Sequence, residues 1–258
     1  MSIRDRKIRI FKSGKEGAEF LLGKWKEISG AAIRKRDRFT AALSGGRTPV
    51  PFYQKLAGLR DPQVWERTHI FQVDERFVPA ESEDSNYGMM RREFLDTVPI
   101  PRNNIHPVPV EEYCARAAAE RYEADIRSFF GLPPEIFPRF DFVLLGIGED
   151  GHTASLFPRT PRLAKTSRIV AAVVPESAKH DRITLTLPVL NSAGNVFFMV
   201  TGKSKAAILK KIVEGTDAAL PASMVEPESG RIWVVADAGA ASLFCGFQRS
   251  AGKQRPTV

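Results

Sequence analysis

The sequence predicts an α/β fold in which a mostly parallel sheet is covered by helices on both faces. Two observations predict this fold class. Strand-like runs alternate with stretches of helical periodicity, and those runs are apolar throughout instead of alternating with polar residues. A continuous apolar run is typical of a parallel strand, because helices cover both of its faces. No repeat, low-complexity tract or obvious linker interrupts the pattern, so we expect residues 1–258 to form one domain.

Short apolar runs, rich in β-branched and aromatic residues, are predicted as strands. They are Ile8–Phe11, Phe39–Leu43, His69–Val73, Phe140–Leu145, Ile169–Val174, Ile183–Leu187, Val196–Val200 and Ile232–Ala236. The predicted helices are Glu16–Arg36, Tyr87–Asp96, Glu111–Phe130 and Lys203–Glu214. The third helix is the clearest, since Tyr122, Ile126 and Phe129 recur at helical spacing and Gly131 follows its end.

The composition is typical of a globular enzyme, with 43% hydrophobic and 26% charged residues. No apolar run approaches the roughly 20 residues of a membrane-spanning helix, so we expect no membrane partner. The charged N-terminus has no apolar stretch of the kind found in a secretory signal. Two cysteines, Cys114 and Cys245, favour a reducing compartment without a disulfide framework. We therefore expect a cytoplasmic protein.

The net charge of +8 is concentrated near the two ends of the chain. Residues 1–38 hold twelve Lys and Arg against five Asp and Glu, and the last ten residues hold three basic residues and no acid. Solvated charges at the ends do not form the basic face that a nucleic-acid partner needs. We expect no nucleic-acid partner, and a monomer or a small homo-oligomer.

Four polar motifs each follow a predicted strand. They are Ser44–Pro49, Asp74–Arg76, Gly146–His152 and Thr201–Lys205. In a parallel sheet, the carboxyl ends of the strands share one edge, and ligands bind there at the point where the strand order reverses. Motifs that are distant in sequence therefore meet around one ligand.

The first motif is suited to an anion such as a phosphate. Gly45 and Gly46 allow the backbone to approach the anion, and their N–H groups are free to point at it. Pro49 is well placed to begin a helix. A plain turn capped by Ser44 is the alternative interpretation. Lys205 of the fourth motif would supply a cation to the same phosphate; otherwise it is a solvated lysine.

The third motif places His152 after a glycine-rich turn, at the expected junction between a strand and a short helix. A histidine there is a candidate general base or acid near neutral pH. Asp150 either orients the imidazole ring or binds a substrate hydroxyl. The second motif brings Asp74 and Arg76 to the same edge, where they either bind substrate or form a surface ion pair. No histidine has partners at metal-ligand spacing, so no metal site is indicated.

These motifs, in this order, resemble the 6-phosphogluconolactonase family. The segments that carry the resemblance are Ser44–Pro49, Asp74–Pro79, Ser85–Met89, Gly146–Pro158, Arg182–Pro188 and Thr201–Ala206. The block that ends in Leu156-Phe157-Pro158 is the most specific of them. Arg47 departs from the pattern, because the family usually has a small hydroxyl residue there; the arginine either adds a cation near the phosphate or points outward.

The resemblance implies hydrolysis of 6-phospho-D-glucono-1,5-lactone to 6-phosphogluconate, a Rossmann-like three-layer fold, and no metal or organic cofactor. In that mechanism, His152 activates water, and Arg76 or a backbone N–H near Gly148 stabilises the oxyanion. The phosphate is expected to bind at Ser44, Gly45, Gly46, Arg182 and Lys205. The candidates for the sugar hydroxyls are Asp74, Asn86 and Asp150.

Three other functions remain open at this point. A glucosamine-6-phosphate deaminase would use Asp74 as its carboxylate base, although residues 153–158 lack the acidic residue that those enzymes have shortly after Asp-Gly-His. A serine esterase would use Ser44, since Ala42–Gly46 nearly fits a nucleophile elbow. A sugar-phosphate sensor would bind the ligand without turnover.

Overall fold

The computed structural model describes residues 6–158, 166–174 and 179–244. Their main feature is a seven-stranded parallel sheet with the order β1-β10-β9-β6-β2-β3-β5. Its strands are β1 (Lys7–Phe11), β2 (Phe39–Leu43), β3 (Thr68–Gln72), β5 (Ile105–His106), β6 (Phe142–Leu145), β9 (Asn195–Val200) and β10 (Arg231–Asp237). The predicted fold class is confirmed, and the short strand β5 is an addition to it.

A second sheet of three antiparallel strands is the largest departure from the sequence-based expectation. It consists of β4 (Asp74–Arg76), β8 (Arg182–Leu185) and β7 (Val170–Val173). Two of the predicted strands, Ile169–Val174 and Ile183–Leu187, therefore belong to this sheet and not to the parallel one. Asp74–Arg76 was not among the predicted strands, but it pairs with β8 so that Asp74 lies opposite Thr184 and Arg76 opposite Arg182.

The helices agree with the prediction where the sequence signals are strong. Their bounds are α1 (Gly14–Arg36), α2 (Val50–Leu56), α3 (Pro62–Glu66), α4 (Asn86–Met90), α5 (Ala115–Phe130), α6 (Leu187–Ser192), α7 (Ala206–Glu214) and α8 (Pro221–Met224). Short turns of other helix types are η2 (π, Arg91–Leu95), η3 (3₁₀, Arg102–Asn104) and η5 (3₁₀, Lys203–Lys205). Predicted helix 87–96 is thus α4 continued as a π-helix, and predicted helix 203–214 begins with a 3₁₀ turn.

Caps and left-handed residues set the helix ends. The Ser13 hydroxyl accepts a hydrogen bond from the Glu16 amide at the start of α1, and Cys114 Sγ accepts one from the Ala117 amide at the start of α5. Gly131 ends α5 with φ 62°. Because the cap is at Cys114, α5 is shorter at its N-terminus than the predicted helix Glu111–Phe130.

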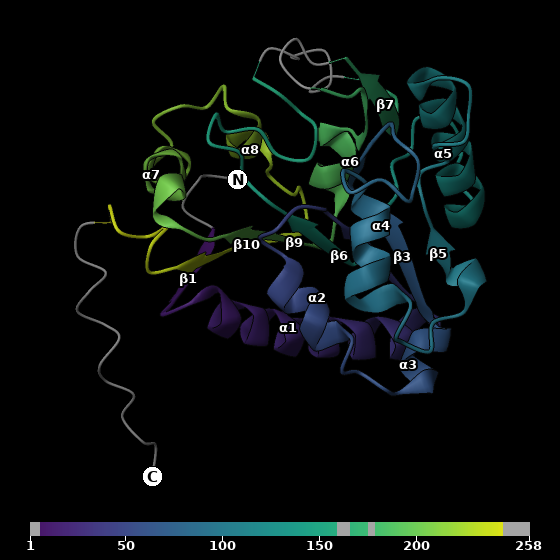
Figure 1. The fold of residues 1–258 in the computed structure, drawn as a ribbon, viewed down its shortest axis with the longest axis horizontal. Coiled ribbons are helices and arrows are strands. Elements are labelled where there is room, and N and C mark those ends of the chain that lie inside the picture. The colour runs from purple at the N-terminus through teal and green to yellow at the C-terminus, as the bar shows by residue number, and fades with distance from the viewer. Residues whose placement is uncertain (1–5, 159–165, 175–178, 245–258) are drawn as a thin grey trace.

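Two hydrophobic cores lie on opposite faces of the parallel sheet. One core joins the sheet to α1, α2, α3 and α4, with Trp25, Phe52 and Trp65 fully buried. The other joins it to α5, α6, α7, α8 and the second sheet. Figure 1 shows α1 to α3 on one side of the sheet and α6 to α8 on the other. Successive residues of β2 serve different cores, Ala41 and Ala42 for example, as a strand buried on both faces requires.

The strand order reverses beside β2. The chain runs from β2 to β3 on one side, and it later returns to β6 on the other side of β2. The loops after β2 and β6 therefore diverge at adjacent strand ends, which leaves a crevice at the carboxyl edge. In the described part of the chain, no helix is long and apolar enough to cross a membrane.

Candidate active site

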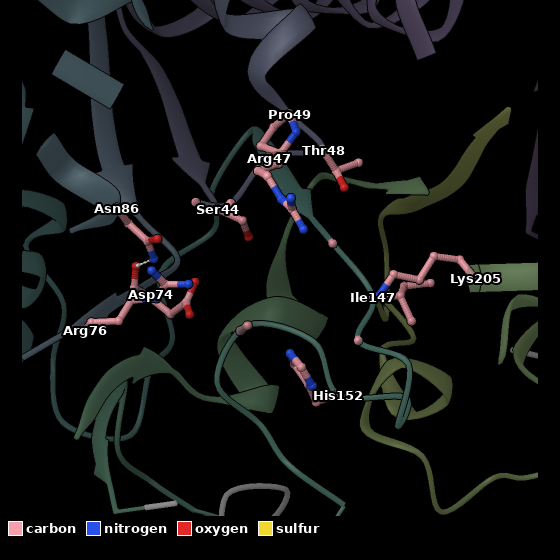
Figure 2. Close-up of a pocket in the computed structure, with 15 residues that line it drawn as sticks. Ser44, Arg47, Thr48, Pro49, Asp74, Arg76, Asn86, Ile147, His152 and Lys205 are labelled. Atoms are coloured by element: carbon pink, nitrogen blue, oxygen red, sulfur yellow. Dashed lines mark hydrogen bonds between the residues drawn. The ribbon is translucent and has the colours of Figure 1, made fainter. Parts of the chain in front are cut away.

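A cavity of about 240 Å³ lies at this reversal point, at the carboxyl edge of the parallel sheet. Residues of all four polar motifs line it, together with Asn86, and Figure 2 shows their side chains. The lining residues are Ser44, Gly45, Gly46, Arg47, Thr48, Pro49, Asp74, Arg76, Asn86, Gly146, Ile147, Gly148, His152, Ala154 and Lys205. The prediction that distant motifs meet around one space is confirmed.

The β2–α2 loop, residues 44–49, presents backbone donors to the cavity. Within the described residues, the N–H groups of residues 45–48 donate no hydrogen bond. Gly46 has φ 87°, a conformation that favours glycine. At Gly45, an added Cβ would lie 1.8 Å from Asn86 Oδ1, so only glycine fits between the loop and α4. Unpartnered amides gathered on one loop are an anion-binding arrangement.

Ser44 is buried at the start of this loop. Its hydroxyl Oγ has no hydrogen-bond partner among the described residues, and its carbonyl accepts a hydrogen bond from the Tyr53 hydroxyl of α2. A nucleophilic serine needs a hydrogen bond to its general base. Ser44 Oγ has no such bond to His152 in this structure, so the geometry does not support the serine-esterase alternative.

His152 lies in the loop after β6, and its ring points into the cavity (Figure 2). Asp150 Oδ1 lies 2.6 Å from His152 Nδ1 and also accepts a hydrogen bond from the His152 amide. Partial burial raises the pKa of Asp150, but the hydrogen bonds and the charge of His152 outweigh it and leave the pKa below its ordinary value. Asp150 does not line the cavity; it contacts the histidine.

Two expectations about this loop are corrected. His152 does not precede a short helix, because residues 153–156 form a turn closed by an isolated bridge between Thr153 and Leu156. A backbone N–H near Gly148 was a candidate oxyanion donor, but the Gly148 amide itself donates to the His152 carbonyl at 2.8 Å. That hydrogen bond closes the loop and leaves this N–H occupied.

Asp74 is buried at the side of the cavity, at the start of β4. Its Oδ2 accepts a hydrogen bond from Ser155 Oγ at 2.7 Å. Burial raises the pKa of Asp74, although this hydrogen bond and the charge of Arg76 oppose the effect. The Asn86 side chain donates from Nδ2 to the Asp74 carbonyl at 2.9 Å, and Figure 2 draws this bond. This hydrogen bond fixes the position of the Asn86 side chain relative to Asp74.

Glu75, the middle residue of the second motif, faces away from the cavity and is 1% exposed. Its carboxylate accepts hydrogen bonds from the backbone amides of Asn86 and Tyr87, from the Arg76 amide, and from the side chains of Gln72 and Ser85. Burial nevertheless raises its pKa. These bonds tie the start of α4 to β4 and so set where Asn86 lies, a role that sequence reasoning missed.

Arg76 and Arg182 are paired across β4 and β8. Arg76 lines the cavity and donates from Nη1 to the Asp84 carbonyl, whereas Arg182 does not line it and donates to the His180 carbonyl. Burial and the charge of Arg76 lower the pKa of Arg182. Arg182 therefore lies beside Arg76 on the neighbouring strand, and not in the wall with Ser44, Gly45, Gly46 and Lys205 as expected.

Lys205 reaches the cavity from the 3₁₀ turn before α7. Its Nζ is 3.9 Å from Glu149 Oε1, a distant and partly exposed ion pair. In Figure 2, Lys205 lies on the opposite side of the cavity from Arg76, with His152 between them. Lys203, the other lysine of this 3₁₀ turn, does not line the cavity.

Of the predicted site residues, Ser44, Gly45, Gly46, Asp74, Arg76, Asn86, His152 and Lys205 line the cavity, and Asp150 and Arg182 do not. Sequence reasoning missed Thr48, Ile147 and Ala154, which lie inside the quoted motifs, and Ser155, which binds Asp74. The described residues contain no cluster of three or more His, Cys, Asp or Glu suited to a metal ion.

A parallel α/β fold with an anion-binding loop, a histidine and a buried carboxylate at the strand-reversal point defines an α/β protein built to bind a small anionic ligand. Comparison with known families identifies it further. Residues 13–234 match the family described as glucosamine-6-phosphate isomerases/6-phosphogluconolactonase. The chain belongs to this family.

Individual relatives agree with this assignment. The chain is 42% identical to a 6-phosphogluconolactonase of Synechocystis sp. over 79% of this chain and 84% of the relative. It is 38% identical to the human 6-phosphogluconolactonase over 83% of this chain and 84% of that protein. Among solved structures, the 6-phosphogluconolactonase of Trypanosoma cruzi superposes with a TM-score of 0.84 at 31% identity, covering 95% of this chain and 98% of the other.

Proposed function

We propose that this protein is a 6-phosphogluconolactonase, which hydrolyses 6-phospho-D-glucono-1,5-lactone to 6-phospho-D-gluconate in the oxidative pentose phosphate pathway. One observation carries the proposal: His152 and the unpartnered amides of the β2–α2 loop open into the same cavity. A ring ester with a phosphate at its far end needs a base and an anion site in one space. The relatives named above support the choice of substrate.

His152 acts as the general base through Nε2. A carboxylate only accepts hydrogen bonds, so the short contact with Asp150 holds the proton on His152 Nδ1 and leaves Nε2 unprotonated. Nε2 takes a proton from water as the water oxygen adds to the lactone carbonyl carbon. The same proton is then transferred to the ring oxygen as its bond to that carbon breaks. Asp150 orients the imidazole and stabilises its charged form.

Arg76 is the oxyanion donor in this mechanism, because the Gly148 amide is already bonded within its loop. Among the described residues, the Arg76 guanidinium makes one hydrogen bond, to the Asp84 carbonyl, and a guanidinium has five N–H donors. Asp74 keeps one carboxylate oxygen for a sugar hydroxyl, since the other accepts from Ser155. Asn86 lies beside it for a second hydroxyl.

The phosphate binds to the amides of Gly45 and Gly46, to the Ser44 hydroxyl and to Lys205 in this proposal. Arg182, which is paired with Arg76 across β4 and β8, contributes positive potential from outside the cavity wall. Anchoring the phosphate positions a lactone that also hydrolyses in water, so the remaining chemistry needs only modest assistance.

The test is a coupled assay. Glucose-6-phosphate dehydrogenase generates the lactone, and its disappearance is timed with and without the protein. We expect faster disappearance with the wild type and near-background loss with His152→Ala. Binding of 6-phosphogluconate without any lactone turnover would indicate a sensor and refute the enzyme.

A deaminase acting on glucosamine 6-phosphate is the second candidate. The observation that favours it is the buried Asp74, whose raised pKa suits a proton-abstracting base. The stretch after His152, residues 153–158, has no acidic side chain, which favours the lactonase. Ammonia release from glucosamine 6-phosphate, measured with the same preparation, decides between the two activities.

We further propose that residues 1–258 act as one domain, as a monomer or small homo-oligomer in the cytoplasm, with the sugar phosphate as the partner. The two cores share one sheet, which supports the single domain. The charge excess near the chain ends supports the absence of a nucleic-acid partner. Retention on a nucleic-acid column at physiological salt would contradict this last point.

A further inference from the structure

Arg47 is a positively charged residue of the cavity wall whose charge is not paired with another group of the described protein. Within the described residues, its side chain has no hydrogen bond, ion pair or ring contact. Its exposed head group is therefore unconstrained. The other two cations of the wall have protein contacts: Arg76 donates to the Asp84 carbonyl, and Lys205 lies 3.9 Å from Glu149.

The side chain of Arg47 is directed into the cavity and not outward. Figure 2 shows its guanidinium extending from the loop into the space between Ser44 and Ile147. It follows Gly46, whose φ of 87° turns the chain at this point. The guanidinium thus enters the same space as the unpartnered amides of residues 45–48.

An unpaired guanidinium beside a group of free amides matches a doubly charged oxyanion. Its planar fork donates two parallel hydrogen bonds to a phosphate, which a small hydroxyl side chain at the same position cannot do. A substrate without the phosphate has no charged group to pair with the Arg47 guanidinium. The arginine therefore discriminates between phosphorylated and unphosphorylated substrates.

We infer that Arg47 is a specificity-determining residue that binds the phosphate of the substrate and selects phosphorylated lactones over unphosphorylated ones. The inference rests on the proposed function, since it assigns the phosphate end of that substrate to the β2–α2 loop. Arg47 takes no part in moving the proton, which His152 does. Its effect is therefore on substrate binding.

The test compares Arg47→Ser and Arg47→Lys with wild type, using the phosphorylated lactone and unphosphorylated glucono-1,5-lactone. Arg116→Ser is the matched control, because it also removes one positive charge, from a side chain 84% exposed on α5. For Arg47→Ser, we expect KM for the phosphorylated lactone to rise roughly tenfold with kcat nearly unchanged. The unphosphorylated substrate and the Arg116→Ser control should show no change, and Arg47→Lys should recover part of the affinity.

An unchanged KM in Arg47→Ser overturns the inference, and so does an equal loss on both lactones, which would indicate a structural role. The slope of KM against salt concentration should also be smaller in Arg47→Ser than in wild type. If wild type hydrolyses neither lactone, the proposed function fails. Titration of 6-phosphogluconate by calorimetry then tests Arg47 separately: weaker binding by Arg47→Ser supports the inference, and equal binding overturns it.

Discussion

Asp150 Oδ1 lies 2.6 Å from His152 Nδ1, and the same oxygen accepts a hydrogen bond from the His152 amide at 3.1 Å. The carboxylate therefore sets both the backbone and the ring of the histidine. Partial burial raises the pKa of Asp150, but these contacts with His152 lower it by more, so the pKa lies below its ordinary value. Because Asp150 holds the His152 ring in one orientation, Nε2 is directed at the cavity before the substrate binds.

The first prediction concerns the histidine itself. His152→Ala should lower kcat for lactone hydrolysis about 10²–10⁴-fold, because the general base is lost. KM should change little, since the phosphate contacts are on other residues. Stopped-flow or coupled kinetics over a range of lactone concentrations measures both constants. A kcat near that of wild type would remove the histidine from the mechanism.

The second prediction separates orientation from proton transfer. Asp150→Asn keeps the shape of the side chain but loses the charge that holds Nδ1–H. We expect kcat to fall by roughly 10- to 100-fold, less than in His152→Ala, with the melting temperature within a few degrees of wild type. If KM rises and kcat does not fall, Asp150 binds a substrate hydroxyl instead.

The third prediction concerns the lysine at the far side of the cavity. Lys205→Ala should raise KM for the phosphorylated lactone roughly tenfold, because a charge-assisted hydrogen bond to phosphate is lost. Lys203→Ala is the matched control: it lies in the same 3₁₀ turn and does not line the cavity. Equal effects of the two substitutions would show that only the general charge of the turn matters.

The fourth prediction tests the close approach of the β2–α2 loop to α4. Gly45→Ala places a Cβ 1.8 Å from Asn86 Oδ1, so Asn86 must move and its hydrogen bond to the Asp74 carbonyl is lost. We expect a loss of kcat/KM of more than tenfold, about the effect of losing one to two hydrogen bonds. Gly23→Ala, on an open position of α1, should leave activity unchanged and stabilise the helix slightly.

The fifth prediction concerns acid stability, at a site remote from the cavity lining. His69 Nδ1 and His106 Nε2 are 3.2 Å apart, and burial with the charge of His69 lowers the pKa of His106 from 6.5 to about 4. The unfolded chain therefore binds a proton that the folded one does not, so the free energy of unfolding should fall as pH drops from 6.5 towards 4. This loss is absent above pH 6.5, where both states are neutral.

Urea unfolding of wild type and His106→Gln at pH 7.5 and pH 4.5 measures that difference. The variant should lose less stability between the two pH values than wild type. A loss of the same size in both proteins would mean that other groups cause the acid sensitivity.

The parallel sheet and the position of the site were predictable from local patterns. The apolar run Phe39–Leu43 corresponds to β2 in full, and the Gly-Gly turn and the Asp-Gly-His loop lie at adjacent strand ends, as the topology rule requires. Two strands of the second sheet were predicted as strands, but not their separation from the parallel sheet, and β4 was missed because the three residues Asp74–Arg76 have no periodicity that marks a strand. Only pairing with β8 makes them one.

The sequence by itself determined the residue types at the site: glycines that free backbone donors, a histidine two residues after an aspartate, and cations that follow strands. The family resemblance rests on those motifs. The tertiary structure alone decided which groups face the cavity. It buried Glu75, whose carboxylate binds the start of α4, and paired Arg182 with Arg76 across two strands. It also occupied the Gly148 amide and left Arg47 without a side-chain partner among the described residues. The physical reason is that burial and hydrogen-bond partners come from segments far apart in the chain, and no local pattern specifies them.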